Sequence, residues 1–104
     1  MRQHKRVHCK DGFSVSIQAS SGNYCTPRID DADLWTSVEL GYPSQADYLI
    51  IKYAEDKDKP TATVYGWVPV DTVYLLLTKH GGVVSGEVPK GIPVYDKQFP
   101  RKNK

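Results

Sequence analysis

Apolar and polar residues alternate without interruption over residues 13–20. Because successive side chains of a strand point to opposite faces, this pattern predicts a half-buried strand with one apolar face and one face turned to water. Asp11 and Gly12 come directly before it. Such a dipeptide between two apolar runs is typical of a hairpin turn, so residues 7–9 are expected to pair with this strand.

Two further stretches, residues 34–42 and 63–68, also have a period of two and predict strands. In the second stretch, Tyr65 and Trp67 fall on the same face. Two hypotheses for these rings stay open. Either they form part of the core against a helix, or they form an exposed surface on which bases stack.

Residues 70–80 carry the clearest helical pattern in the chain. Apolar side chains recur at the first, fourth, fifth and eighth positions counted from Val70, which places them on one helix face. Asp71 lies at the positive end of the helix dipole, and Lys79 and His80 lie in the last turn. The two glycines that follow predict the end of the helix. We expect His80 to act as a helix-end cation rather than as a general base.

The segment at residues 45–54 is ambiguous. Ser44 and Asp47 have the spacing of a capping box, and the apolar residues after them follow a helical period. The run at residues 48–51, however, is rich in strand-forming side chains. We favour a short helix, followed by an exposed charged turn at residues 55–60.

Short edge strands are expected at residues 83–84 and 92–95. The elements together indicate an α+β fold, because several short strands precede one clear helix without regular alternation. The expected architecture is a small, mostly antiparallel sheet packed by one main helix at about 70–80, with a second short helix at about 45–54.

Length and composition fit one folded domain spanning residues 1–104, with basic, frayed ends at 1–5 and 97–104. Apolar residues make up 39% of the chain and charged residues 25%, which is usual for globular proteins. No apolar run approaches the roughly 18 residues that span a membrane. The basic start is not followed by an apolar segment, so we expect no secretory signal and a cytoplasmic location.

Charge is divided unevenly along the chain. Residues 1–10 and 90–104 together hold nine Lys and Arg against one acid, whereas residues 11–89 hold five against eleven. The net charge of +2 therefore conceals ends that carry +8 and a body that carries −6. Basic ends favour contacts with phosphates, and an acidic body favours a basic protein groove, such as one that normally holds nucleic acid.

No pattern of catalytic or metal-binding residues is apparent. His8 and Cys9 are adjacent, so on a strand they face opposite sides, and no second pair with zinc-ligand spacing accompanies them. The acidic run at residues 30–33 lacks the glycine and distal glutamate of a calcium loop. We therefore expect no enzyme, no metal and no cofactor, and we expect Cys9 and Cys25 to be free thiols.

Several short strings of the sequence together resemble the short, uncharacterised proteins encoded in bacteriophage and prophage genomes. They are CKDGFS (9–14), SIQAS (16–20), YCTPR (24–28), VELGYPS (38–44), YAED (53–56), TVYGWVPV (63–70) and KHGG (79–82). The resemblance covers roughly residues 9–82 and leaves both basic ends unmatched. It implies a small protein that binds a host defence complex, such as a CRISPR effector, and inhibits it in the host cytoplasm.

We therefore expect a non-enzymatic protein-binding module, a phage-encoded, anti-CRISPR-like inhibitor or modulator of a host nucleic-acid-processing or defence complex. Its contacts would come from two loops, at residues 25–35 and 55–60, provided that these loops are neighbours. The expected partner-binding residues are Tyr24, Arg28, Asp30, Asp31, Asp33, Trp35, Glu55, Asp56 and Asp58.

The alternative is a nucleic-acid-binding accessory protein that acts through its basic ends. The residues that would carry this function are Arg2, Lys5, Arg6, Lys10, Arg101, Lys102 and Lys104. Neither reading involves a membrane partner.

Overall fold

The hairpin predicted from Asp11 and Gly12 is present in the computed structural model, which describes residues 3–93. Its two strands are β1 (Val7–Cys9) and β2 (Ser14–Gln18), which pair antiparallel. Gly12 closes the turn with φ +99, a conformation that glycine adopts without steric cost.

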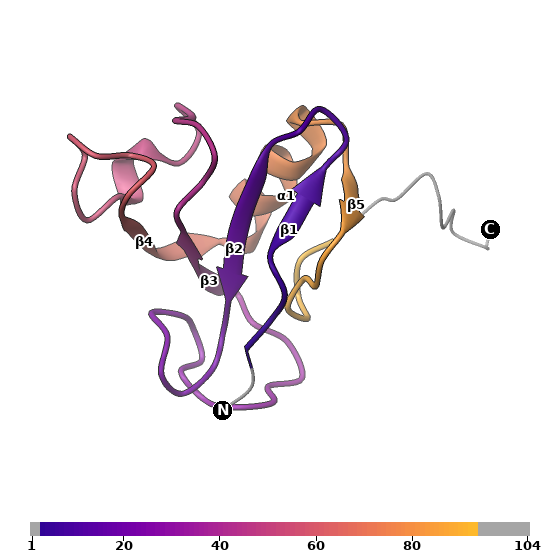
Figure 1. The fold of residues 1–104 in the computed structure, drawn as a ribbon. Coiled ribbons are helices and arrows are strands. Elements are labelled where there is room, and N and C mark those ends of the chain that lie inside the picture. Colours follow the sequence, from indigo (N-terminus) through magenta and orange to yellow (C-terminus); the bar gives the residue numbers. More distant parts are fainter. Residues whose placement is uncertain (1–2, 94–104) are drawn as a thin grey trace.

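The hairpin is the centre of a five-stranded antiparallel sheet with the order β4-β3-β2-β1-β5 (Figure 1). The remaining elements are β3 (Ser37–Gly41), the 3-10 helix η1 (Ile51–Tyr53), β4 (Val64–Pro69), α1 (Val70–Lys79) and β5 (Val83–Ser85). The predicted α+β class, with a small antiparallel sheet and one main helix, is confirmed. The edge strand expected at 83–84 is present as β5, whereas 92–93 form no strand and 94–95 lie outside the described residues.

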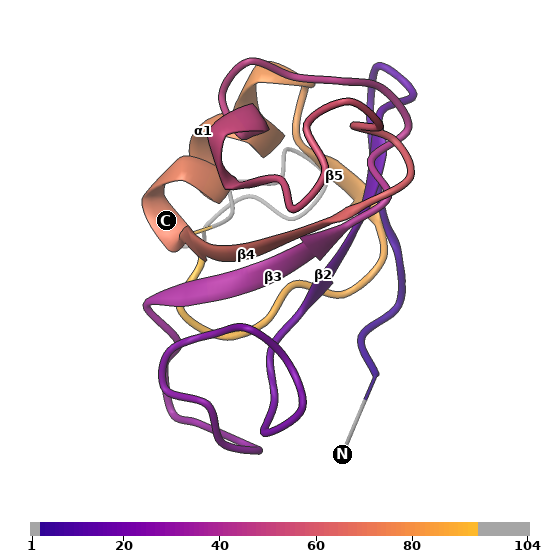
Figure 2. The ribbon, with the colours of Figure 1, turned by 90° about the vertical axis from the view of Figure 1, so that its left-hand side faces the viewer.

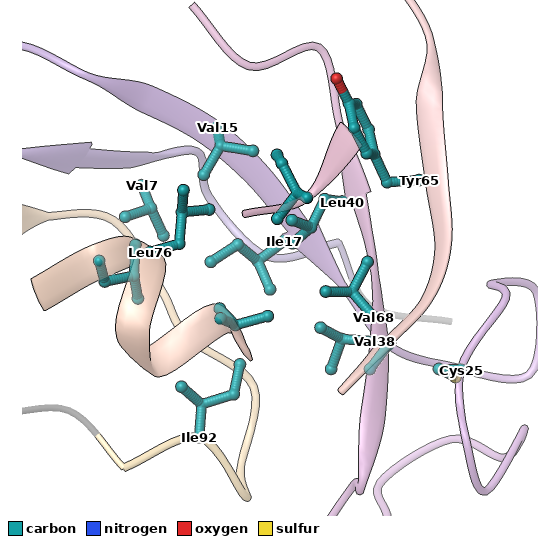
Figure 3. Close-up of a cluster of buried hydrophobic side chains, with 14 of the residues drawn as sticks. Val7, Val15, Ile17, Cys25, Val38, Leu40, Tyr65, Val68, Leu76 and Ile92 are labelled. Atoms are coloured by element: carbon teal, nitrogen blue, oxygen red, sulfur yellow. The ribbon is translucent and has the colours of Figure 1, made fainter. Parts of the chain in front are cut away.

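Helix α1 starts directly after β4 and packs on one face of the sheet (Figure 2). Val73, Leu76 and Leu77 are its buried residues, as the helical spacing of apolar side chains implies. Figure 3 shows side chains from the sheet and the helix meeting in the resulting core. No helix within residues 3–93 has the length and apolar character needed to cross a membrane.

The helix expected at 45–54 is reduced to the single turn of η1. The two residues that suggested a helix cap make tertiary contacts instead. The Ser44 hydroxyl accepts a hydrogen bond from the backbone N–H of Ser14, and the Asp47 carboxylate contacts His80 at the end of α1. Asp47 Oδ1 accepts from the Leu49 N–H, and the Ser44 N–H donates to the Ser14 carbonyl, so a capping box between Ser44 and Asp47 does not form.

The polar face of β2 is covered rather than open to water, contrary to the prediction. Ser14 and Gln18 are buried. The N-terminal segment lies across them: the Gln18 amide exchanges two hydrogen bonds with the backbone of His4, and Arg6 Nε donates to the Ser14 hydroxyl. Hydrogen bonding to a neighbouring segment thus replaces hydration of this face.

The two long connections of the sheet lie at opposite ends of the molecule. Residues 19–36 link β2 to β3, and residues 42–63 link β3 to β4. Because both strand pairs are antiparallel, these connections leave opposite ends of β3. Figures 1 and 2 agree, with one connection at the bottom and the other at the top of each view.

Candidate functional site

A β-bulge interrupts the pairing of β4 with β3. Leu40 pairs with Tyr65, but Val38 pairs with Val68, so β4 has one more residue than β3 between these two pairs. Trp67 lies in this interval and has φ +50, a left-handed backbone conformation that residues other than glycine rarely adopt. The bulge therefore contains a strained tryptophan.

The bulge separates two rings that were predicted to share one face. Tyr65 is fully buried in the core, and its hydroxyl donates to the Pro60 carbonyl at 2.7 Å (Figure 3). Trp67 is 50% exposed. The prediction is wrong because the extra residue shifts the alternation of side chains between them. The core hypothesis thus holds for Tyr65, whereas Trp67 lies at the surface.

Tyr24, from the 19–36 connection, packs against this exposed indole. The two rings are nearly parallel at 19°, with their centroids 4.8 Å apart. The Tyr24 carbonyl accepts from the backbone N–H of Trp67 at 3.0 Å, and the Tyr24 N–H donates to Glu39 Oε1 at 2.8 Å. A Cβ at Gly66 would lie in van der Waals contact with the Tyr24 side chain, at 3.4 Å from its Cβ, so Tyr24 packs closely on this part of β4.

Arg28 extends this surface. Its guanidinium carbon lies 5.2 Å from the centre of the Tyr24 ring, within the range of a cation–π contact. The base of the loop is tied to the sheet, because Thr26 exchanges backbone hydrogen bonds with Thr36 and Ser37. Arg28, Tyr24 and Trp67 thus form one contiguous group at the surface, which we call the aromatic cluster.

A pocket of about 680 Å³ lies beside the same connection. Three segments that are distant in the sequence line it: the 19–36 connection, the N-terminal segment and the residues after β5. The lining residues are His4, Ala19, Ser20, Asp30, Asp31, Ala32, Trp35, Glu87, Val88 and Lys90.

Trp35 is part of the core rather than a surface anchor, contrary to our expectation. It is only 5% exposed. The strand predicted for residues 34–42 does not include its first three residues, since β3 begins only at Ser37. Leu34, which was expected on the apolar face, is exposed to solvent. The indole packs near the ring of His4, with centroids 6.4 Å apart.

The acidic loops do not form one surface, so the hypothesis that they act together is wrong. Asp30, Asp31 and Asp33 lie in the β2–β3 connection, whereas Glu55, Asp56 and Asp58 lie in the β3–β4 connection at the other end of the sheet. All six are exposed, and Asp30 and Asp31 line the pocket. Only the first group lies in the same connection as Tyr24 and Arg28.

Few of the basic residues proposed for nucleic-acid binding belong to the described part of the chain. Lys5 and Lys10 are exposed. The Arg6 guanidinium is engaged within the protein, because its Nη2 donates to the carbonyls of Tyr42 at 2.6 Å and Ser14 at 3.2 Å. The other members of this set, Arg2, Arg101, Lys102 and Lys104, lie outside the described residues.

His80, at the end of α1, lies between two carboxylates. Its Nδ1 is 2.7 Å from Asp11 Oδ2, its Nε2 is 2.9 Å from Asp47 Oδ2, and its ring stacks on Phe13 with centroids 4.0 Å apart. Its side chain is only 4% exposed. The contacts tie the β1–β2 turn, the helix end and the β3–β4 connection together, and they leave neither ring nitrogen facing solvent.

Asp47 is the buried member of this network, with a side chain 2% exposed. Burial opposes its ionisation, but hydrogen bonds from the Leu49 N–H, from His80 and from Lys79 outweigh burial and lower the pKa of its carboxyl. Lys79 Nζ lies 3.0 Å from Asp47 Oδ2. Asp11 likewise has a lowered pKa, chiefly because it accepts from the Phe13 N–H and then from His80.

Cys9 and Cys25 are free, buried thiols, as predicted. Burial, followed by the charge of Asp11, raises the pKa of Cys9 to about 11, and burial raises that of Cys25. Within residues 3–93, no three His, Cys, Asp or Glu side chains are grouped in a way that would hold a metal ion.

The sequence analysis left open whether Trp67 is a core or a surface residue and did not place it among the partner-binding residues. One signal was available, because an isolated glycine inside a strand pattern often marks a bulge, and Gly66 directly precedes Trp67. Comparisons of the chain with protein-family models, with curated proteins and with solved structures find no match.

Proposed function

We propose that this protein is a non-catalytic protein-binding module whose contact surface is centred on the aromatic cluster. One observation carries the proposal: a half-exposed tryptophan is held in a left-handed backbone conformation. That conformation costs roughly 1–2 kcal/mol for a residue with a Cβ. Backbone strain of this kind is concentrated at functional sites, where the surrounding structure maintains it.

The composition of the cluster supports contact with a protein. Trp, Tyr and Arg are the residues that most often dominate protein interfaces. The Trp67 indole is supported by the Tyr24 ring, and the Tyr24 backbone is fixed at both its N–H and its carbonyl. Because these side chains are ordered before binding, they lose little conformational freedom on association.

The class of partner rests on the resemblance to phage-encoded proteins. It favours a host defence or nucleic-acid-processing complex, which the protein would inhibit or modulate by occupying one of its surfaces. Inhibition by stoichiometric binding requires no catalytic residues, only a preformed contact surface.

The test is affinity retention from a nuclease-treated bacterial lysate, with the full chain immobilised. We expect the wild type to retain a protein in near-equal amount and Trp67→Gly to retain none. The matched control is Tyr48→Gly, which removes a ring that is 76% exposed in the β3–β4 connection at the opposite end of the sheet. It should retain the same protein as the wild type.

Two results would overturn the proposal. One is equal retention by the wild type and by Trp67→Gly. The other is retained material that consists of nucleic acid and disappears with nuclease or high salt, which would assign the function to the basic ends of the chain.

A further inference from the structure

The pocket lined in part by the 19–36 connection combines buried apolar residues with exposed acidic ones. Its floor is made by Ala19, Ala32 and Trp35, each of which is buried in the core. Carboxylates enter from two sides, with Asp30 and Asp31 on the 19–36 connection and Glu87 after β5. We call this site the acidic pocket.

The walls of the acidic pocket are fixed by backbone contacts. The Trp35 N–H donates to the Lys90 carbonyl at 2.9 Å, which joins the floor to the segment after β5. Glu87 accepts from the Lys5 N–H through its carboxylate and donates its own N–H to the Lys5 carbonyl. Hydrogen bonds therefore join the segments that line the pocket.

The charge of the acidic pocket is negative. Three carboxylates face one ammonium group, that of Lys90. Asp30 accepts a hydrogen bond from the Ser21 N–H at 3.0 Å, and this contact lowers the pKa of its carboxyl. No ion pair joins Lys90 to Asp30 or Asp31 among the described residues. Asp30 and Asp31 are both exposed, so a cationic side chain from outside can reach their carboxylates.

We infer that the acidic pocket binds lysine or arginine side chains from a basic segment of the protein partner. This inference rests on the proposed function. A long cationic side chain matches both parts of the site, because its methylene stem packs on an apolar floor while its head contacts carboxylates. At about 680 Å³, the pocket has room for more than one such side chain.

The position of the pocket links it to the aromatic cluster. One connection supplies Tyr24 and Arg28 to the cluster and Asp30 and Asp31 to the pocket. A partner that contacts both sites would engage two parts of this one connection. Complementary charge there would orient the partner and accelerate association.

The test is fluorescence anisotropy of a labelled peptide with alternating arginine and glycine, titrated with the full chain at low salt. Asp30→Asn with Asp31→Asn removes two pocket charges with little effect on folding, since Asn tolerates the left-handed φ of +53 at position 31. The matched control is Asp56→Asn with Asp58→Asn, which removes two charges in the β3–β4 connection. We expect about tenfold weaker binding for the pocket variant and less than about twofold for the control.

Equal losses in both double variants would overturn the inference, because they would indicate unspecific attraction to the acidic body. Absence of binding by the wild type would also overturn it. The experiment separates this inference from the proposed function: Trp67→Gly should bind the peptide as the wild type does, although it no longer retains the protein partner. Full retention of the partner by the pocket variant would refute the pocket's role and leave the aromatic cluster standing.

Discussion

The Tyr24 ring lies 4.8 Å from the Trp67 indole and nearly parallel to it, so a loop residue and a strand residue form one surface. The same two residues are joined by a backbone hydrogen bond of 3.0 Å from the Trp67 N–H to the Tyr24 carbonyl. The bulge at Trp67 turns the indole outward, and the loop holds it there. The protein thereby presents a rigid aromatic group at the cost of a strained backbone.

Trp67→Gly should lower the free energy of unfolding by only about 1–2 kcal/mol. The variant loses the stacking with Tyr24, about 1 kcal/mol, and the burial of half of the indole, about 2 kcal/mol. Removal of the Cβ from the left-handed conformation returns about 1–2 kcal/mol. Urea unfolding monitored by circular dichroism measures the difference.

Trp67→Val is the matched variant for this prediction. It removes the same ring but keeps a Cβ, and a branched one, at φ +50. It should be less stable than Trp67→Gly by about 1–2 kcal/mol. If the two variants unfold at the same urea concentration, the backbone at position 67 is not strained.

Asp47→Asn should lower the free energy of unfolding at neutral pH by about 2 kcal/mol, because His80 and Lys79 lose their charged partner in a buried site. The corresponding fall in melting temperature is about 10 °C. Thermal unfolding followed by circular dichroism checks this. A change below about 2 °C would mean that the network contributes little to stability.

Stability should also fall in acid because of the same carboxylates. Asp47 and Asp11 have pKa values lowered by folding, so each stabilises the folded state above the unfolded value of about 3.9. This contribution to stability is lost as the pH falls from the unfolded pKa through the lower pKa of the folded state. The wild type should lose stability over that range, and Asp47→Asn should show a shallower loss. If the stability of the wild type and of Asp47→Asn falls with the same slope in acid, the Asp47 carboxylate does not contribute to the acid dependence.

Both thiols should be inert in the native protein. Cys9 and Cys25 are buried and have raised pKa values, so little thiolate forms at pH 8 and reagents do not reach it. We expect Ellman's reagent to react with neither residue in the native state and with both after unfolding in urea. Rapid labelling of either residue without denaturant would contradict this.

Gly91→Ala should destabilise the protein far more than Gly12→Ala. Both residues have positive φ, +115 and +99. A Cβ at Gly91 would overlap the Trp35 carbonyl, whereas a Cβ at Gly12 meets nothing within 4 Å. We expect a loss of about 3 kcal/mol at position 91 and about 1 kcal/mol at position 12. Equal losses would mean that the segment after β5 does not pack tightly on Trp35.

Local patterns predicted the hairpin at Asp11 and Gly12 and the helix at about 70–80, observed at Val70–Lys79, because turn chemistry and helical spacing act over a few residues. They failed where distant segments decide the structure. Asp47 contacts His80 instead of capping a helix, and the bulge that exposes Trp67 depends on pairing with β3. Sequence analysis placed Tyr24 and Arg28 among the partner-binding residues, whereas it left open whether Trp67 is exposed.

The most direct test of the aromatic cluster as a contact surface is site-specific photo-crosslinking in a nuclease-treated bacterial lysate. A benzophenone amino acid replaces Trp67 in one protein and the exposed Tyr48 in another. We predict that irradiation joins position 67 covalently to a discrete protein and that position 48 gives no such product. Absence of a product at position 67, or the same product at equal yield from position 48, would contradict the account.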